Sequence, residues 1–186
     1  LVAYRLANEH TVERIDSRAI ETRFGGFTLH TYRDRLSHDL HFALVRGQID
    51  GSKPTLVRVH VKNPLADVLH WQRPDFGVAA IDALEAIANE GSGVMVVLTE
   101  PMSHEQLLAR LTGEPSRPGV GDAGPAGVRA GEWRRNGAGS QILADLGVHR
   151  LRVLGTPRRQ VGLGGFGLEV VEYVESRESA IGNGES

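Results

Sequence analysis

The feature that most restricts the fold is an amphipathic segment that leads directly into an uninterrupted apolar run. The segment Gly77–Glu90 has apolar residues at helical spacing, with Asp75 as the predicted N-terminal cap and Gly91 as the predicted end. The run VMVVLT that follows has no polar alternation, which is typical of a strand buried on both faces in a parallel sheet. A helix that is followed directly by such a strand predicts an α/β fold, a layered domain with a mixed β-sheet. The inward face of the helix would be formed by Ile81, Leu84, Ile87 and Ala88.

Further helices and strands are predicted on both sides of this unit. Ser103–Leu111 has the pattern of a short helix capped by Ser103, with its three leucines inward. A third helix is predicted at Ser140–Leu146, ended by Gly147. The remaining apolar runs predict strands at Gly26–Tyr32, Leu40–Val45, Leu56–Val61, Leu151–Leu154 and Leu168–Val174.

A glycine motif near the C-terminus matches a dinucleotide-binding pattern only in its letters. The stretch from Gly162 to Gly167 fits G-x-G-x-x-G, but Leu168–Val174 after it is rich in β-branched residues. The fingerprint holds a pyrophosphate only where a helix leaves the glycines. We therefore predict a turn before the last strand.

Composition excludes several classes of function. A net charge of −2 gives no general attraction to nucleic acid or to a membrane, and no apolar run reaches the length of a membrane span. The absence of cysteine excludes disulfides, thiol catalysis and thiolate zinc sites. The cytoplasm is the expected compartment. The cluster of His38, Asp39 and His41 invites a metal interpretation, but we expect it to be the solvated start of a strand.

Two regions are predicted to lie outside the folded core. Residues 1–16 have loosely helical apolar spacing and fit the end of a preceding domain plus a linker, which leaves 17–186 as the domain described above. Residues 112–131 contain six glycines and three prolines and almost no large apolar side chain. Such a composition cannot offset the entropy cost of ordering, so a mobile loop is predicted there.

Two blocks of the chain resemble the GTP cyclohydrolase II family. The stretch RVHVKNPLADVLHWQRPDFG is similar to the signature of that family, and the final stretch around Gly162–Gly167 resembles its closing turn and strand. Residues 1–15 resemble the end of a 3,4-dihydroxy-2-butanone 4-phosphate synthase, which precedes this domain in bifunctional riboflavin biosynthesis proteins. The signature is matched at Arg58, Val59, His60, Asp67, Arg73, Asp75 and Gly77.

The resemblance implies a catalytic zinc held by three cysteines, and all three are absent here. The corresponding positions are Asn63, Pro74 and Phe76, so we expect the zinc to be lost. We expect Phe76 and Pro74 to fill the space by packing against Trp71 or Leu69. A substitute metal site stays open as an alternative, made from His60, Asp67, His70 and Asp75.

Other family features are also missing. Lys62 stands where the family has a glutamate, and Ala79 replaces the glutamine that reads guanine. The arginine-rich phosphate loop is replaced by LTEPMSHEQLLARL. Without a metal there is no activated water, and without the loop little holds a triphosphate.

What remains of the family's site is a set of polar residues. Glu132 and Arg134 correspond to an acidic residue and an arginine that act near the α-phosphate, and we interpret them as vestigial. A weak nucleotide or anion pocket would be formed by Arg58, His60, Arg134, Thr156 and Arg159. The alternative is that these arginines pair with carboxylates or lie in solvent.

The resulting hypothesis is a non-catalytic GTP cyclohydrolase II-like domain that supports the assembly, stability or regulation of an attached synthase. The alternatives are a working GTP cyclohydrolase II and a domain that senses a nucleotide or metabolite. The resemblance implies magnesium only for the upstream synthase. The expected partners are that synthase domain in the same polypeptide and a second copy in a homodimer.

Overall fold

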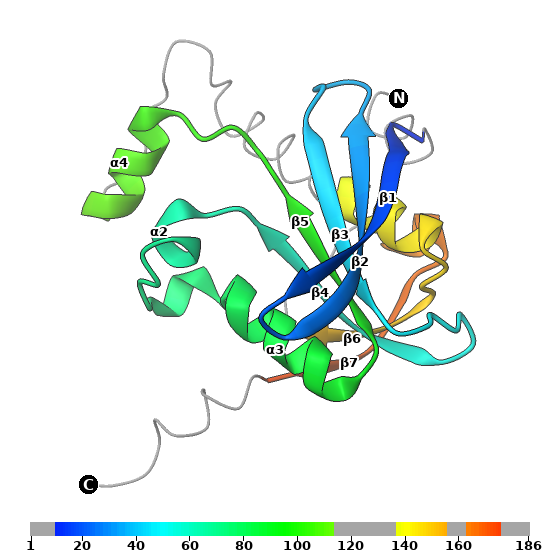
Figure 1. Ribbon diagram of the computed structural model, residues 1–186. Coiled ribbons are helices and arrows are strands. Elements are labelled where there is room, and N and C mark those ends of the chain that lie inside the picture. Colours follow the sequence, from blue (N-terminus) through cyan, green and yellow to red (C-terminus); the bar gives the residue numbers. More distant parts are fainter. Residues whose placement is uncertain (1–9, 114–136, 156–162, 176–186) are drawn as a thin grey trace, which may run out of the picture.

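A seven-stranded mixed sheet forms the centre of the computed structural model, which describes residues 10–113, 137–155 and 163–175. The strand order is β1-β2-β3-β5-β4-β6-β7 (Figure 1). Strands β1, β2, β3 and β5 are antiparallel to their neighbours, whereas β5, β4, β6 and β7 run parallel. The predicted α/β class and mixed sheet are confirmed. The strands are β1 (Val12–Thr22), β2 (Gly25–Asp34), β3 (Leu40–Arg46), β4 (Pro54–Val61), β5 (Gly93–Leu98), β6 (Arg150–Leu154) and β7 (Glu169–Val174).

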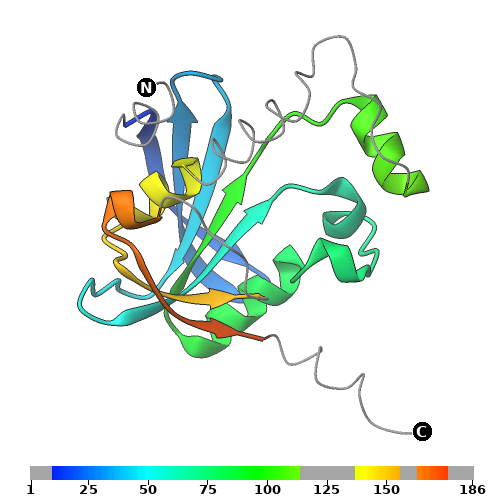
Figure 2. The same ribbon diagram turned by 180° about the vertical axis from the view of Figure 1, so that it is seen from behind.

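Helices cover both faces of the sheet (Figures 1 and 2). Helix α3 (Ala80–Glu90) packs Ala83 and Ile87 on one face, and the helical residues 137–145 pack on the other. Strand β5 serves both layers, because its side chains alternate between the two apolar clusters. Val94, Val96 and Leu98 belong to the cluster under helix 137–145, whereas Met95 and Val97 contact the cluster under α3.

The first strand was not predicted. Residues 12–15 were interpreted as part of a helix, but β1 pairs with β2 along its whole length, from Val12 opposite Asp34 to Thr22 opposite Gly25. The helical interpretation is wrong there because the two apolar residues of this stretch, Val12 and Ile15, are too few to define a helical period. Residues 1–9 lie outside the described part of the chain, so the helix proposed for them and the boundary at residue 16 stay predictions.

Helix α3 ends as predicted and begins differently. Gly91 adopts φ 83° at its C-terminus, where glycine carries no steric cost. The N-terminal cap is Ala79 rather than Asp75, which lies in the short 3-10 helix η1 (Pro74–Phe76). Asp75 was a wrong assignment because its carboxylate is bound by Arg73 at 3.0 Å.

Helix α4 (His104–Thr112) confirms its predicted cap but not its predicted packing. The Ser103 side chain accepts a hydrogen bond from the Gln106 backbone N–H, and the Gln106 side chain accepts one from Ser103 N–H. No residue of the helix is buried, and Leu108 and Leu111 are exposed. The inward orientation predicted for them is therefore wrong, because α4 projects away from the sheet (Figure 1).

The glycine-rich turn is confirmed where the structure describes it. A short 3-10 helix η2 (Leu163–Phe166) and Gly167, with φ 70°, precede β7. The predicted mobile loop at 112–131 falls almost entirely outside the described residues. No helix among the described residues has the length and apolar character needed to cross a bilayer.

His41 is buried, and the expectation of a solvated strand start is wrong for it. It lies opposite Tyr32 in the β2–β3 pair, and its Nδ1 atom accepts a hydrogen bond from Thr99 N–H at 3.2 Å. This bond requires an unprotonated Nδ1. Burial lowers the pKa of His41 below its ordinary value of 6.5, and the nearby Asp34 and Asp39 carboxylates only partly offset that shift.

We predict that the free energy of unfolding falls as the pH drops below 6.5. Because the pKa of His41 is lowered in the folded state, the unfolded chain takes up the proton first. His30 adds to the same pH window, since burial also lowers its pKa. The variant His41→Asn keeps an acceptor for Thr99 N–H without titrating. Urea unfolding at several pH values should therefore give a shallower decline for this variant, and an unchanged slope would contradict the assignment.

Candidate functional site

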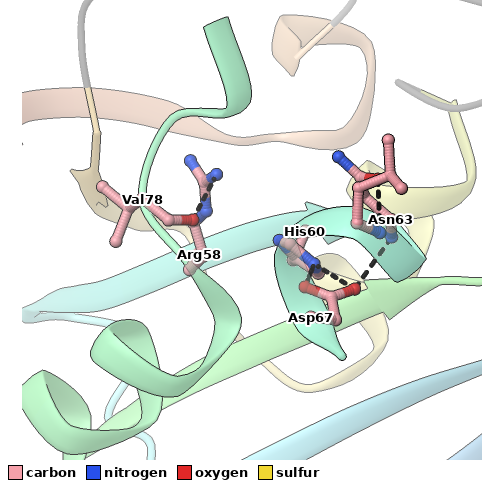
Figure 3. Close-up of polar contacts among 6 residues, drawn as sticks. Arg58, His60, Asn63, Asp67 and Val78 are labelled. Atoms are coloured by element: carbon pink, nitrogen blue, oxygen red, sulfur yellow. Dashed lines mark hydrogen bonds and ion pairs between the residues drawn. The ribbon is translucent and has the colours of Figure 1, made fainter. Parts of the chain in front are cut away.

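The parallel strands β4, β5, β6 and β7 all end at one edge of the sheet. Ligands of open α/β sheets bind at such carboxyl-terminal edges. Arg58 and His60 occupy alternate positions at the end of β4, so both side chains lie on the α3 side of the sheet (Figure 3). The two predicted site residues therefore share a face, but each has its own partners.

His60 is paired with Asp67 of helix α2 (Pro64–Asp67). The His60 Nε2 atom lies 2.8 Å and 3.0 Å from the two carboxylate oxygens of Asp67, and His60 is buried (Figure 3). Asp67 Oδ2 also accepts the backbone N–H of Asn63 at 2.8 Å. A single carboxylate thus fixes both the imidazole at the end of β4 and the first residue of the next turn.

Asn63 is the N-terminal cap of α2. Its side-chain Oδ1 accepts the backbone N–H of Leu65 at 3.2 Å, and Pro64 follows at the first helical position. Asn63 is itself buried. The amide side chain therefore serves the local backbone and presents its oxygen to the helix rather than to the open edge.

Arg58 connects three parts of this edge through backbone carbonyls. Its Nη1 atom donates to the carbonyl of Leu154 at the end of β6 at 3.2 Å. Its Nη2 atom donates to the carbonyl of Val78 at 3.0 Å (Figure 3). Two glycines leave room for the guanidinium. A Cβ atom at Gly77 would lie 3.3 Å from Nη2, and one at Gly155 would lie 3.0 Å from Nη1.

The aromatic residues near Pro74 contact the Arg73 guanidinium and are not buried in an apolar core. The rings of Trp71 and Phe76 meet edge to face with centroids 6.1 Å apart. The Arg73 guanidinium lies 5.2 Å from the Trp71 centroid and 4.9 Å from the Phe76 centroid. The predicted contact between Phe76 and Trp71 is present. The predicted burial is wrong, because Phe76 is half-buried and Pro74 and Leu69 are exposed.

The comparison with known families agrees with this arrangement of strands and signature residues. The model of the family described as GTP cyclohydrolase II matches residues 13–175. The chain belongs to the GTP cyclohydrolase II family. The match begins at the second residue of β1 and ends directly after β7, so it covers all seven strands except Val12.

Relatives of this GTP cyclohydrolase II-family chain are riboflavin biosynthesis proteins. A 3,4-dihydroxy-2-butanone 4-phosphate synthase of Pseudomonas aeruginosa is 41% identical over 175 residues, which cover 94% of this chain and 46% of that protein. The riboflavin biosynthesis protein RibBA of Aquifex aeolicus is 37% identical over 182 residues, covering 94% and 44%. The chain thus spans less than half the length of these relatives.

A solved structure supports the same fold. The crystal structure of RibBX from A. baumannii, a two-domain 3,4-dihydroxy-2-butanone 4-phosphate synthase, superposes with a TM-score of 0.64 and 33% sequence identity. The similarity covers 93% of this chain and 43% of the RibBX chain.

The zinc that the family resemblance implies does not fit the residues at this edge. Pro74 and Phe76 have no donor atom, and the Asn63 oxygen already accepts the Leu65 N–H. The substitute ligand set is not brought together either. His60 and Asp67 bind each other, Asp75 binds Arg73, and His70 is exposed. Within residues 10–113, 137–155 and 163–175, no three His, Cys, Asp or Glu side chains are grouped closely enough to hold a metal ion.

Of the remaining positions, Lys62 and Ala79, which depart from the family signature, are described by the structure, whereas four predicted site residues are not. Lys62 is exposed, and Ala79 caps α3. The role of Asp67 was not predicted, although an Asn-Pro pair directly after a strand is a recognisable helix start. Glu132, Arg134, Thr156 and Arg159 lie outside the described residues and stay predictions.

We predict that Asp67→Ala lowers the free energy of unfolding by about 2 kcal/mol. The substitution leaves buried His60 and the Asn63 N–H without their common acceptor, and a buried polar group left unsatisfied costs about 1–3 kcal/mol. Asp75→Ala is the matched control, because it removes a carboxylate from an ion pair whose acidic partner is exposed. Equal losses for the two variants in urea unfolding would show that the Asp67 cluster does not stabilise this edge.

Proposed function

We propose that this chain is a non-catalytic GTP cyclohydrolase II domain of riboflavin biosynthesis, which supports the assembly, stability or regulation of an attached 3,4-dihydroxy-2-butanone 4-phosphate synthase. The proposal rests on the three positions where the resemblance places zinc ligands, because none of them has a side chain free to bind zinc. Pro74 and Phe76 offer no donor, and Asn63 is committed to capping α2.

Loss of the metal removes the chemistry of the first step. A bound zinc supplies an activated water for attack on the purine ring, because it lowers the pKa of that water to about 7. In this chain buried His60 and partly buried Asp67 are bound to each other, and Asp67 also accepts the Asn63 backbone N–H. We therefore infer that this domain binds no zinc and hydrolyses no GTP.

Loss of the phosphate loop weakens substrate binding as well. The segment after β5 leads into α4, and the N-terminus of that helix is closed by its own capping box. The Gln106 N–H donates to Ser103 at 3.1 Å and is therefore engaged within the helix start itself. Of the two arginines of the signature, Arg58 donates to the Leu154 and Val78 carbonyls and Arg73 pairs with Asp75. These contacts favour a structural role for the polar residues over binding of a triphosphate.

The names of the relatives support a synthase as the partner. The P. aeruginosa relative and the two-domain A. baumannii protein are both described as 3,4-dihydroxy-2-butanone 4-phosphate synthases, and this chain aligns with less than half of each. A domain that is kept without its metal ligands is best explained by contacts with its neighbour. In this proposal any magnesium chemistry belongs to the synthase and none to the described sheet.

We predict that deleting residues 12–186 from the natural polypeptide that contains this chain impairs the synthase. The deletion starts at Val12, because β1 begins there and a shorter deletion would leave part of a strand. The expected result is a lower synthase kcat/KM, a lower thermal midpoint, or a changed association state. Asp75→Ala in the same polypeptide is the control and should leave all three unchanged.

Two outcomes would contradict this proposal. If the synthase keeps its kcat/KM, thermal midpoint and association state after the deletion, the domain does not support it. If GTP or FMN raises the thermal midpoint of the intact polypeptide, the domain binds a metabolite and the sensing hypothesis replaces the present one.

A further inference from the structure

Exposed apolar side chains gather at one edge of the sheet. Among the described residues, nine large apolar side chains are exposed, and eight of them lie on segments at the edge where β2, β4 and β5 end. The ninth, Val171, lies within β7. We call the eight residues the carboxyl-edge face. They are Ile15, Leu36, Leu40, Val68, Leu69, Trp71, Leu108 and Leu111, and their exposed fractions lie between 40% and 71%.

The antiparallel half of the sheet contributes three of these side chains. Strand β2 runs in the direction of β5, because each of the two is antiparallel to β3. The turn that carries Leu36 and the first residue of β3, Leu40, therefore lie at the carboxyl edge. Val12 stands opposite Asp34, the last residue of β2, so β1 begins at the same edge and Ile15 follows three residues later.

The parallel half contributes the other five, on the loop after α2 and on α4. The N–H groups of Val68 and Trp71 both donate at 3.1 Å to carbonyls of α2, so this loop is held by its backbone. Arg73 joins the loop to α4, because its Nη1 atom donates to the Arg110 carbonyl at 2.7 Å. No residue of α4 is buried, so its exposed leucines are uncovered in the described part of the chain. The loop, α4 and the β2–β3 turn lie in the upper half of Figures 1 and 2.

The chain enters the domain at this same edge. The Thr11 N–H donates to the side-chain oxygen of buried Gln141 at 2.8 Å, and the Thr11 carbonyl accepts the Arg35 N–H, also at 2.8 Å. These bonds fix Thr11 beside the turn that carries Leu36. Residues 1–9 can span at most about 30 Å, so a domain attached at residue 1 is held close to the carboxyl-edge face.

We propose, on the basis of the proposed function, that the attached synthase domain packs on the carboxyl-edge face and is joined to it through residues 1–9. More than half of each relative described above lies outside the region that aligns with this chain, so a partner of sufficient size is available. In this arrangement the edge that holds ligands in open α/β sheets serves as an interface between two domains. The domain is then retained for the surface at its former ligand edge.

The size and character of the face fit an interface between domains of one polypeptide. Such interfaces bury about 600–1,500 Å², and eight large apolar side chains that are each 40% to 71% exposed supply area of that order. A monomer seldom leaves apolar patches of more than a few hundred Å² uncovered. The polar rim that interfaces usually have is provided by exposed charges of both signs, from Glu13, Arg35, Lys62 and Glu105.

The segments outside the described structure are weaker candidates for covering the face. Residues 114–136, 156–162 and 176–186 together contain only five large apolar residues, which are Val120, Val128, Trp133, Val161 and Ile181. Residues 1–9 are richer, with Leu1, Val2, Tyr4 and Leu6. Four side chains cannot cover eight that are spread over both halves of the sheet, so we assign residues 1–9 to the connection and the rest of the cover to the synthase domain.

The first test measures whether the face is covered in the natural polypeptide that contains this chain. Because the chain has no cysteine, Leu36→Cys, Leu69→Cys and Leu108→Cys are made singly, and labelling of each site by a maleimide is followed by mass spectrometry. Exposed positions tolerate such substitutions. Val171→Cys is the matched control, because Val171 is 36% exposed and lies outside the face.

We expect the three face variants to be labelled at least about tenfold more slowly than Val171→Cys. This order is the reverse of the exposure within the domain itself, where Leu36, Leu69 and Leu108 are 56%, 65% and 60% exposed. Labelling of the face variants as fast as that of Val171→Cys would overturn the proposal.

The second test identifies what covers the face. A thiol-linked benzophenone, which inserts into nearby C–H bonds, is attached to the Leu108→Cys variant of the same polypeptide and activated by light. We expect mass spectrometry to find linked peptides from the synthase domain. Linked peptides only from residues 1–186 would show that a second copy or another segment of this chain covers the face. That result, or no linked peptide, would overturn the proposal.

Neither readout depends on synthase activity, zinc content or GTP turnover. If the synthase domain covers the face but deletion of residues 12–186 leaves the synthase unchanged, the proposed supporting function fails and the interface stands. If the deletion impairs the synthase while the face is labelled freely, the support acts through another surface and the interface proposed here is wrong.

Discussion

The burial of β5 on both faces is the constraint on which the rest of this structure depends. Val94, Met95 and Val96 are fully buried, so one strand must be covered by α3 on one side and by helix 137–145 on the other. Burying a large apolar side chain contributes about 1.5–3 kcal/mol, which makes these two layers the main source of stability. Because β5 runs parallel to β4 and antiparallel to β3, the same strand also joins the two halves of the sheet. The strands β4, β6 and β7 continue the sheet parallel to β5, so all four strands end at the same edge.

At this edge the polar side chains form hydrogen bonds with other segments of the protein. Asp67 binds His60 and the Asn63 backbone, and Arg58 binds the carbonyls of Leu154 and Val78. A ligand site would leave some of these donors and acceptors directed at the substrate. In this chain these contacts of Asp67 and Arg58 are made to the protein itself, while the overall fold of the GTP cyclohydrolase II family is retained. Under the proposed function the fold is kept without the catalytic site, which is possible because the apolar layers do not depend on the metal ligands.

Much of the fold was predictable from local patterns, since apolar spacing, a glycine in a left-handed conformation and a serine cap act over a few residues. This is why β4, β5, the end of α3 at Gly91 and the start of α4 at Ser103 were predicted correctly. The failures involve contacts between distant segments. Strand β1 is defined by pairing with β2, and the Nδ1 atom of buried His41 accepts the N–H of Thr99, the residue directly after β5. The residues Arg58, His60 and Asn63 were identified from the family signature, but their partners depend on how the segments fold back on one another.

In the proposed function this domain has the fold of the family without its zinc chemistry. The most direct measurement is the zinc content and GTP turnover of the 186-residue chain, beside a triple variant that carries Asn63→Cys, Pro74→Cys and Phe76→Cys. We expect neither zinc nor formate release from the unmodified chain. The triple variant should gain zinc without turnover, because substrate positioning is still missing and such positioning is worth several powers of ten in rate. Stoichiometric zinc in the unmodified chain, or formate release above background, would contradict the account.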